Sequence, residues 1–237
     1  MTTTPATGER LGAVLVHGMW HGGWAWDAVR AELDAVGVAS AVVELPMTDL
    51  ASDVAATRRV LDEFGRPAVL VGHSYGGAVI TEAGAHDQVR HLVYLTAFQL
   101  DEGETVRTAL AELALPPTRL GEAMRFSADR TEVGLDPTLA AEFLYGDTAP
   151  ADAEAAVARL RTVNTEILHG APAEIAWRRV PSTYVVCTED LAINPDLQRA
   201  MAARASDRLE WPGGHSPACT RPKAVADLVA SLAGRAG

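Results

Sequence analysis

A serine flanked by glycines is the feature of this 237-residue chain that most directly predicts chemistry. The segment Gly72-His73-Ser74-Tyr75-Gly76 follows one apolar run and precedes another, so the pattern G-x-S-x-G lies between a predicted strand and a predicted helix. Glycines leave room for so tight a turn, which strains the backbone at the serine and exposes its hydroxyl above the sheet. We therefore predict that Ser74 is a nucleophile.

A serine hydroxyl is a poor nucleophile unless a base takes its proton, and the base needs an acid to orient it. Among seven histidines, His215 follows the last predicted strand in a glycine-rich loop, which fits the chain order Ser…Asp…His. Glu189 and Asp190 stand at the carboxyl end of another predicted strand, where ligand chemistry gathers in open α/β sheets. We predict His215 as the base and favour Asp190 over Glu189 as the acid.

Other histidines are expected to be structural. His17 should shape the loop after the first strand, and the side chain of His73 should point away from Ser74. His21 is compatible with either a structural or a functional role.

An acyl-transfer site also needs two backbone N–H groups for the oxyanion. The N–H of Tyr75, directly after the nucleophile, is one candidate, and the N–H of Met19, in the loop after the first strand, is the other. Gly18 and Trp20 flank Met19 and are candidate pocket residues. Trp177 is a third candidate, because it ends the long insertion described below and could line its underside.

Strands and helices that could position these residues alternate along the chain. Apolar runs predict strands at residues 11–17, 39–45, 67–72, 89–97, 182–188 and 208–211. Helical spacing predicts helices at residues 25–36, 53–64, 76–85, 195–204 and 222–232. The alternation predicts an α/β fold with a six-stranded, mainly parallel sheet flanked by helices.

The alternation breaks between residues 98 and 179, where no strong strand pattern occurs. Segments near 104–115, 137–145 and 150–161 have helical spacing, so we expect an all-helical insertion that caps an apolar pocket. With no Gly/Ser/Pro-rich linker, one domain over residues 1–237 is expected, with a core of 9–97 and 180–235 and a helical cap of about 98–179.

Composition narrows the classes of partner. The net charge of −11 repels phosphate backbones, so nucleic acid is not an expected partner. Two cysteines make neither a disulfide framework nor a zinc site, and no metal is expected. No apolar run is long enough to span a membrane and the N-terminus has no apolar signal core, so a cytoplasmic protein is expected. The sequence is compatible with a homo-oligomer.

At these same residues the chain resembles the plant methylesterase and hydroxynitrile lyase branch of the α/β-hydrolases and its small bacterial esterase relatives. The opening motif spans residues 15–26, the serine turn spans 72–77, and the acid-bearing segment spans 186–195 with Gln198 and Arg199 after it. Residues 214–217 resemble the histidine loop. The resemblance runs from about residue 11 to 232 and implies that Asp190 is the acid. It also implies the α/β-hydrolase fold with a helical cap, and that no metal or organic cofactor is needed.

Two departures from the lyases of this branch favour the esterases. Where those lyases carry threonine and lysine, this chain has Gly18 and Ser216. The resemblance therefore implies hydrolysis of a small or medium carboxylic ester through an acyl-enzyme. The alternatives are a lyase that uses the same three side chains and a small-ligand-binding protein with vestigial catalysis.

Overall fold

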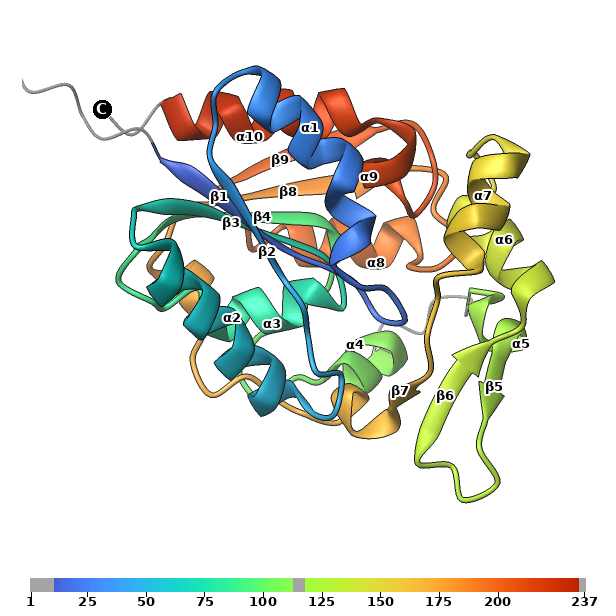
Figure 1. Cartoon of the computed structure of the whole chain (residues 1–237). Helices are drawn as coiled ribbons and strands as arrows, with labels where there is room; N and C mark the ends of the chain where they lie inside the picture. Colours follow the sequence, from blue (N-terminus) through green and yellow to red (C-terminus); the bar gives the residue numbers. More distant parts are fainter. Residues whose placement is uncertain (1–10, 113–117, 235–237) are drawn as a thin grey trace, which may run out of the picture.

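A six-stranded parallel sheet forms the centre of the computed structural model, which describes residues 11–112 and 118–234. The strand order is β2-β1-β3-β4-β8-β9, and every pairing is parallel (Figure 1). The strands are β1 (Gly12–Val16), β2 (Ser40–Val43), β3 (Ala68–Ser74), β4 (Val89–Ala97), β8 (Ser182–Cys187) and β9 (Asp207–Trp211). The predicted parallel sheet is confirmed, and each predicted strand is present to within three residues at either end.

Helices cover both faces of the sheet. On one face lie α1 (Asp27–Ala35), preceded by the 3-10 helix η1 (Gly23–Trp26), and α10 (Pro222–Gly234), with the short α9 (Pro217–Thr220) beside them. On the other lie α2 (Leu50–Phe64), α3 (Gly76–Ala83) and α8 (Pro195–Ala202) (Figure 1). This is the two-sided cover that predicted strands with continuous apolar runs require.

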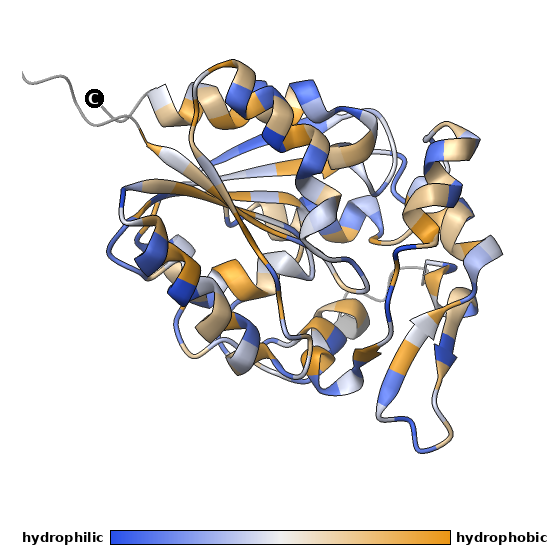
Figure 2. Ribbon diagram, in the orientation of Figure 1, coloured by the Kyte–Doolittle hydropathy of each residue, from blue (hydrophilic) through white to orange (hydrophobic). Residues whose placement is uncertain are grey.

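Alternation along each strand divides the core into two apolar clusters. In β1, Ala13 and Leu15 face the cluster that holds Trp26 of η1, whereas Val14 and Val16 face the cluster beneath α2 and α3. Successive side chains of a strand point to opposite faces, so a strand buried on both sides reads as unbroken apolar sequence. In Figure 2, β1 is accordingly apolar, whereas the edge strand β9 carries hydrophilic residues.

Capping residues set the helix ends that periodicity alone could not locate. The Asp49 carboxylate accepts the N–H of Ser52, so α2 begins at Leu50, three residues before the predicted start. Gly65 ends α2 at a φ of 63°, the left-handed conformation that favours glycine.

The insertion between β4 and β8 is not all-helical, so that prediction is wrong. It contains α4 (Val106–Glu112), α5 (Leu120–Ala123), α6 (Pro137–Tyr145) and α7 (Pro150–Val157), with η2 (Thr165–Leu168) and η3 (Ala176–Arg178). A small antiparallel sheet joins them, with the order β5 (Met124–Phe126), β6 (Glu132–Leu135) and β7 (Val163–Asn164). Residues 113–115 of the helix predicted at 104–115 lie outside the described residues.

These three strands escaped prediction because they are short and mostly half-buried or exposed. Only Val133 and Val163 are buried in them, and strands this short leave no apolar run to read. We call residues 98–179 the cap; its sheet and helices stand beside the loops that follow the parallel strands (Figure 1).

Within residues 11–112 and 118–234, no helix combines the length and apolar character needed to cross a bilayer. The same residues contain no cluster of three or more histidine, cysteine or acidic side chains that could hold a metal ion.

Candidate active site

Ser74 ends β3 in the strained turn that its flanking glycines permit. Its φ is 53°, a left-handed conformation that non-glycine residues rarely adopt. A Cβ on Gly72 would come within 2.6 Å of the Gly76 carbonyl oxygen, and one on Gly76 within 2.7 Å of the Val16 carbonyl oxygen. Only glycine therefore fits at these two positions, and the turn brings the serine side chain to the carboxyl end of the sheet.

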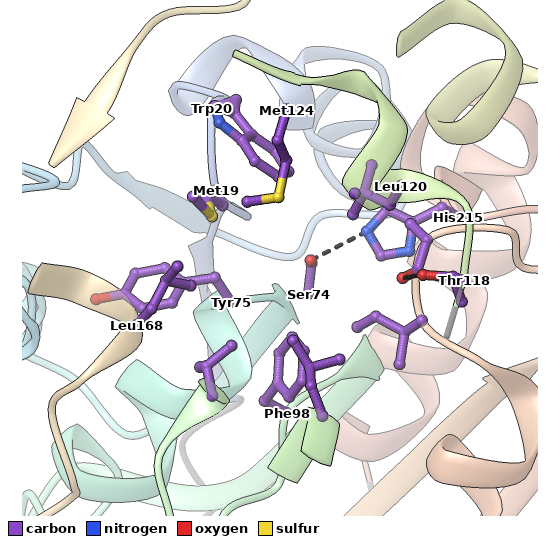
Figure 3. A pocket seen from close by; sticks show the side chains of 15 residues that line it. Met19, Trp20, Ser74, Tyr75, Phe98, Thr118, Leu120, Met124, Leu168 and His215 are labelled. Carbon is purple, nitrogen blue, oxygen red and sulfur yellow. Dashed lines mark hydrogen bonds between the residues drawn. The ribbon is translucent and has the colours of Figure 1, made fainter. Parts of the chain in front are cut away.

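His215 and Asp190 meet Ser74 from two other loops at that end. The Ser74 hydroxyl lies 3.0 Å from His215 Nε2 (Figure 3), and His215 Nδ1 lies 2.8 Å from Asp190 Oδ2. Since Asp190 can only accept, Nδ1 carries the proton and Nε2 is free to accept from Ser74. The three side chains predicted from sequence thus form one continuous chain of hydrogen bonds, and both His215 and Asp190 are 3% exposed.

Asp190 is fixed by donors on both of its oxygens. Oδ1 accepts the backbone N–H groups of Ala192 and Ile193 at 2.7 and 2.9 Å. Oδ2 accepts from Gln198 Nε2 at 2.9 Å and from the Thr96 hydroxyl, in addition to His215. A carboxylate that accepts from this many donors is held in one orientation. Its neighbour Glu189 is exposed, so geometry selects Asp190 of the two acids.

Thr96 and Gln198 are site residues to which sequence reasoning assigned no role. Thr96 stands near the carboxyl end of β4 with a φ of 41°, an outlying value for a β-branched residue. Gln198 lies one turn into α8 and also accepts the N–H of Cys187. The position of Thr96 at a central strand end was the available signal, because those ends meet at one edge of the sheet.

Three further histidines near the site are buried and neutral. His17 donates Nδ1–H to the Gly18 carbonyl and accepts the N–H of Leu45 at Nε2, and burial lowers its pKa to about 3. His73 donates to the His215 carbonyl at 2.7 Å, and burial holds its pKa well below the usual range. Both are structural as predicted, and His73 fixes the backbone of His215.

The role of His21, left open by the sequence, is set by its bonds. Its Nδ1–H donates to the Met19 carbonyl at 2.8 Å, and its Nε2 accepts from the Tyr145 hydroxyl at 2.7 Å. Both ring nitrogens are hydrogen-bonded, and burial lowers the pKa of His21 to about 4. His21 is therefore a neutral, structural residue that holds the loop after β1 in place.

Met19 and Tyr75, the predicted oxyanion donors, both line the cavity at Ser74. Tyr75 stands directly before α3, where backbone N–H groups have no partner within the helix. Its side chain points away from Ser74 (Figure 3) and donates its hydroxyl to Asp53 at 2.7 Å. Burial raises the pKa of the Asp53 carboxyl to about 6.

The cavity above Ser74 has a volume of about 220 Å³ and is mostly apolar (Figure 3). The core contributes Met19, Trp20, Ser74, Tyr75, Ala192, Ile193 and His215, and the cap contributes Phe98, Val106, Leu110, Thr118, Leu120, Gly121, Met124 and Leu168. None of these lining residues carries a permanent charge.

Of the three predicted pocket residues, only Trp20 is among those lining the cavity. Trp177 instead packs against the apolar cluster and donates to the Leu100 carbonyl at 2.8 Å, so its assignment to the pocket is wrong. Gly18 lies directly against the nucleophile, since a Cβ there would stand 2.9 Å from the Cβ of Ser74.

Comparison with known proteins agrees with this geometry. Residues 13–228 match the family described as the Alpha/beta hydrolase family. The chain belongs to that family. The match spans the parallel sheet, the cap and all three side chains of the hydrogen-bonded chain.

Several curated proteins resemble this α/β-hydrolase. It is 28% identical to Alpha/beta hydrolase nvfD of Aspergillus novofumigatus, over 88% of each chain. It is 27% identical to Methylesterase 2 of Arabidopsis thaliana, over 93% of this chain and 95% of that one. It is also 27% identical to Alpha-hydroxynitrile lyase of the same plant, over 93% and 96%. Overall identity therefore does not separate esterase from lyase.

Among solved structures, this α/β-hydrolase is similar to a pyrethroid hydrolase from Sphingobium faniae JZ-2. The TM-score is 0.81 at 22% identity, covering 95% of this chain and 98% of that one. At this identity the likeness shows a shared fold.

Proposed function

We propose that this protein is a serine hydrolase that cleaves small or medium carboxylic esters through an acyl-enzyme. The observation that carries the proposal is the unbroken chain Ser74–His215–Asp190, which opens into an apolar cavity. Similarity to a methylesterase supports the same class of reaction. The chemistry needs no cofactor, because nucleophile, base and acid are all side chains of the chain itself.

In the proposed reaction, Ser74 Oγ attacks the ester carbonyl while its proton passes to His215 Nε2. The resulting oxyanion accepts from the N–H groups of Met19 and Tyr75. His215 then protonates the leaving alkoxide, and the acyl group stays on Ser74. A water molecule, deprotonated by His215, attacks this acyl-enzyme and releases the acid. Asp190 stabilises the imidazolium in both halves.

The cavity lining favours a neutral, apolar substrate. The Thr118 hydroxyl donates to the Ala192 carbonyl, and the Trp20 indole N–H donates to the Val133 carbonyl. Neither donor is therefore available to a substrate. A charged group on the substrate would therefore be buried without a partner, which is costly. We expect p-nitrophenyl hexanoate to be hydrolysed with a kcat/KM at least about 10-fold above that of the p-nitrophenyl half-ester of adipate, in which a carboxylate replaces the terminal methyl group.

A lyase using the same three side chains is the second candidate, and two positions argue against it. Cyanide leaves as an anion, and a lysine beside the histidine would stabilise it, but this chain has Ser216 there. Gly18 offers no hydroxyl. A threonine at position 18 would overlap Ser74, so a Gly18→Thr change is not a clean route to lyase activity.

The test compares ester turnover with cyanide release from mandelonitrile in the unmodified protein. We expect turnover of p-nitrophenyl butyrate or hexanoate, abolished in Ser74→Ala, and cyanide release no higher than that variant gives. Cyanide release above the Ser74→Ala level without hydrolysis of any ester would overturn the proposal in favour of the lyase. Saturable binding of esters without turnover of either kind would instead identify a binding protein.

A further inference from the structure

We propose that Arg161, a cap residue outside the cavity, is a positioning residue for the oxyanion-binding loop. This inference rests on the proposed function, because it assigns Met19 N–H to the oxyanion. It makes the cap part of the apparatus that stabilises the transition state, in addition to its contribution to the pocket wall. Arg161 lies between α7 and β7, in the segment of the cap that runs alongside the core (Figure 1).

Arg161 holds three carbonyl groups of the core. Its backbone N–H donates to the Trp20 carbonyl at 2.9 Å. Its Nε donates to the His21 carbonyl at 2.9 Å, and one terminal nitrogen donates to the Leu45 carbonyl at 2.8 Å. That nitrogen is also 3.4 Å from the Glu44 carboxylate. One residue thus ties the loop after β1 to the segment after β2.

These bonds complete a series of four consecutive carbonyls, at residues 18 to 21, that all accept. The Gly18 carbonyl accepts from His17 Nδ1 and from the His21 N–H, and the Met19 carbonyl accepts from His21 Nδ1. Arg161 supplies the donors for the remaining two. Every peptide plane of the loop is therefore fixed by a bond on its carbonyl side.

Fixing a carbonyl fixes the N–H of the next residue. The peptide unit is planar and trans, so the Met19 N–H points opposite to the Gly18 carbonyl. That carbonyl is bound on the side of His17 and His21, which turns the Met19 N–H the other way. The loop is not relaxed, since Trp20 has a φ of 66°, and a non-glycine residue keeps such a conformation only when its surroundings enforce it.

His21 also connects the loop to a second cap residue, Tyr145. His21 donates to Met19 and accepts from the hydroxyl of Tyr145, which ends α6. Removing the Arg161 guanidinium removes the donor to the His21 carbonyl. Removing the Tyr145 hydroxyl removes the donor to His21 Nε2. The two changes loosen the same loop from different sides without touching the cavity lining.

The experiment compares Arg161→Met with Arg159→Met, a matched control two residues away. Arg159 is exposed; its guanidinium lies over the Trp24 ring and 3.9 Å from the Asp27 carboxylate. We expect Arg161→Met to lower kcat for p-nitrophenyl butyrate about 10- to 100-fold, with KM changed less than about threefold. Arg159→Met should match the unmodified protein. Arg161→Lys, which has one donor group for two carbonyls, should give an intermediate kcat.

An oxyanion-specific readout separates positioning from a general structural role. Ser74 Oγ adds to the carbonyl carbon of an aryl trifluoromethyl ketone, and the serine proton passes to His215. The carbonyl oxygen becomes the oxyanion of a tetrahedral adduct. Its inhibition constant should rise about 10- to 100-fold in Arg161→Met, while that of the corresponding unreactive methyl ketone stays unchanged. Tyr145→Phe, which removes one oxygen, should also raise the inhibition constant of the trifluoromethyl ketone and leave that of the methyl ketone unchanged. It carries the test if Arg161→Met does not fold.

The outcomes distinguish this inference from the proposed function. An unmodified protein that neither hydrolyses esters nor binds the trifluoromethyl ketone more tightly than the methyl ketone would refute the proposed function. An active unmodified protein whose Arg161→Met or Tyr145→Phe variant retains both kcat and the preference for the trifluoromethyl ketone would refute the positioning role alone. Equal weakening of both ketones would also refute it, because that would be a loss of ground-state binding.

Discussion

The core and cap sides of the cavity are built from different kinds of contact. On the core side, Asp190 accepts five hydrogen bonds, and the His215 side chain is bonded at both nitrogens. On the cap side, Leu120, Met124 and Leu168 present apolar side chains. On the core side, Ser74, His215 and Asp190 form a directional hydrogen-bond network, whereas the cap side offers apolar contacts that depend on size and shape.

This difference predicts a division of effects. Directional bonds on the core side should control the rate of the chemical step, because they act on charge that develops in the transition state. Apolar contacts on the cap side should control which substrate is accepted. Arg161 is an exception to this division, because it belongs to the cap but makes directional hydrogen bonds to carbonyls of the core.

The largest effect should come from removing the nucleophile. Ser74→Ala should lower kcat for ester hydrolysis about 10⁴-fold or more, since the loss of one member disables the triad as a unit. The control is an unchanged unfolding midpoint, which shows that the turn still forms. A folded Ser74→Ala protein with a rate near that of the unmodified enzyme would break the assignment of the core side as the site of chemistry.

Removing the acid should have the next largest effect. Asp190→Asn should lower kcat about 10³- to 10⁴-fold, because an amide at this position favours the wrong tautomer of His215. The neighbouring Glu189→Gln is the matched control and should change kcat little, because Glu189 is exposed. If the two variants exchanged these effects, the geometry described for Asp190 would not be the working one.

Acid should weaken the fold through the neutral histidines of the core side. The folded-state pKa values of His17, His21 and His73 are lowered by burial, so below about pH 6.5 the unfolded chain binds protons that the folded chain does not. Asp53, with its pKa raised to about 6, opposes this by taking up one proton in the folded state.

With three imidazoles against one carboxyl, the unfolded chain binds about two more protons than the folded chain, so we expect the free energy of unfolding to fall by roughly 2–3 kcal/mol per pH unit from pH 6 to pH 5. Urea unfolding at several pH values measures this slope. Asp53→Asn, which removes the opposing carboxyl, should make it steeper. A free energy of unfolding that rises on acidification would show that these imidazoles are charged in the folded protein.

The smallest effect should come from the apolar wall of the cap. Met124→Ala enlarges the cavity without touching a hydrogen bond of the core side, so it should shift the ratio of kcat/KM between hexanoate and acetate p-nitrophenyl esters by about 10-fold or less. Turnover of the better substrate should be retained. A loss as large as that of Asp190→Asn would remove the distinction between the two sides.

Much of the core side could be predicted from the sequence because its features are local. The run 67–72, the glycines around Ser74 and the apolar segment after them fix strand, turn and helix within a few residues. His215 and Asp190 follow predicted strands, and parallel strands end at one edge of the sheet. Their meeting with Ser74 therefore follows from topology, even though more than 100 residues separate them from it.

What the sequence could not supply depends on distant contacts. Thr96 bonds to Asp190 because β4 and β8 end side by side, and Gln198 reaches the same carboxylate from α8. The position of Thr96 near a strand end is the one signal in the sequence, and no local pattern marks Gln198. Strands β5, β6 and β7 are too short to produce a period. Trp177 lies at the end of the cap, and the sequence does not show that its indole packs against the apolar cluster and not into the cavity.

The most direct test of the central claim is to map the site of covalent reaction with a fluorophosphonate. In this reaction Ser74 Oγ forms a bond to phosphorus as fluoride leaves, and the serine proton passes to His215. Intact-mass and peptide analysis should find one phosphonyl group per chain, on Ser74, in the unmodified protein and none in Ser74→Ala. Labelling should also be strongly slowed in His215→Ala. Labelling of another residue, or no labelling of a folded, unmodified protein, would contradict the claim that Ser74 is a nucleophile activated by His215.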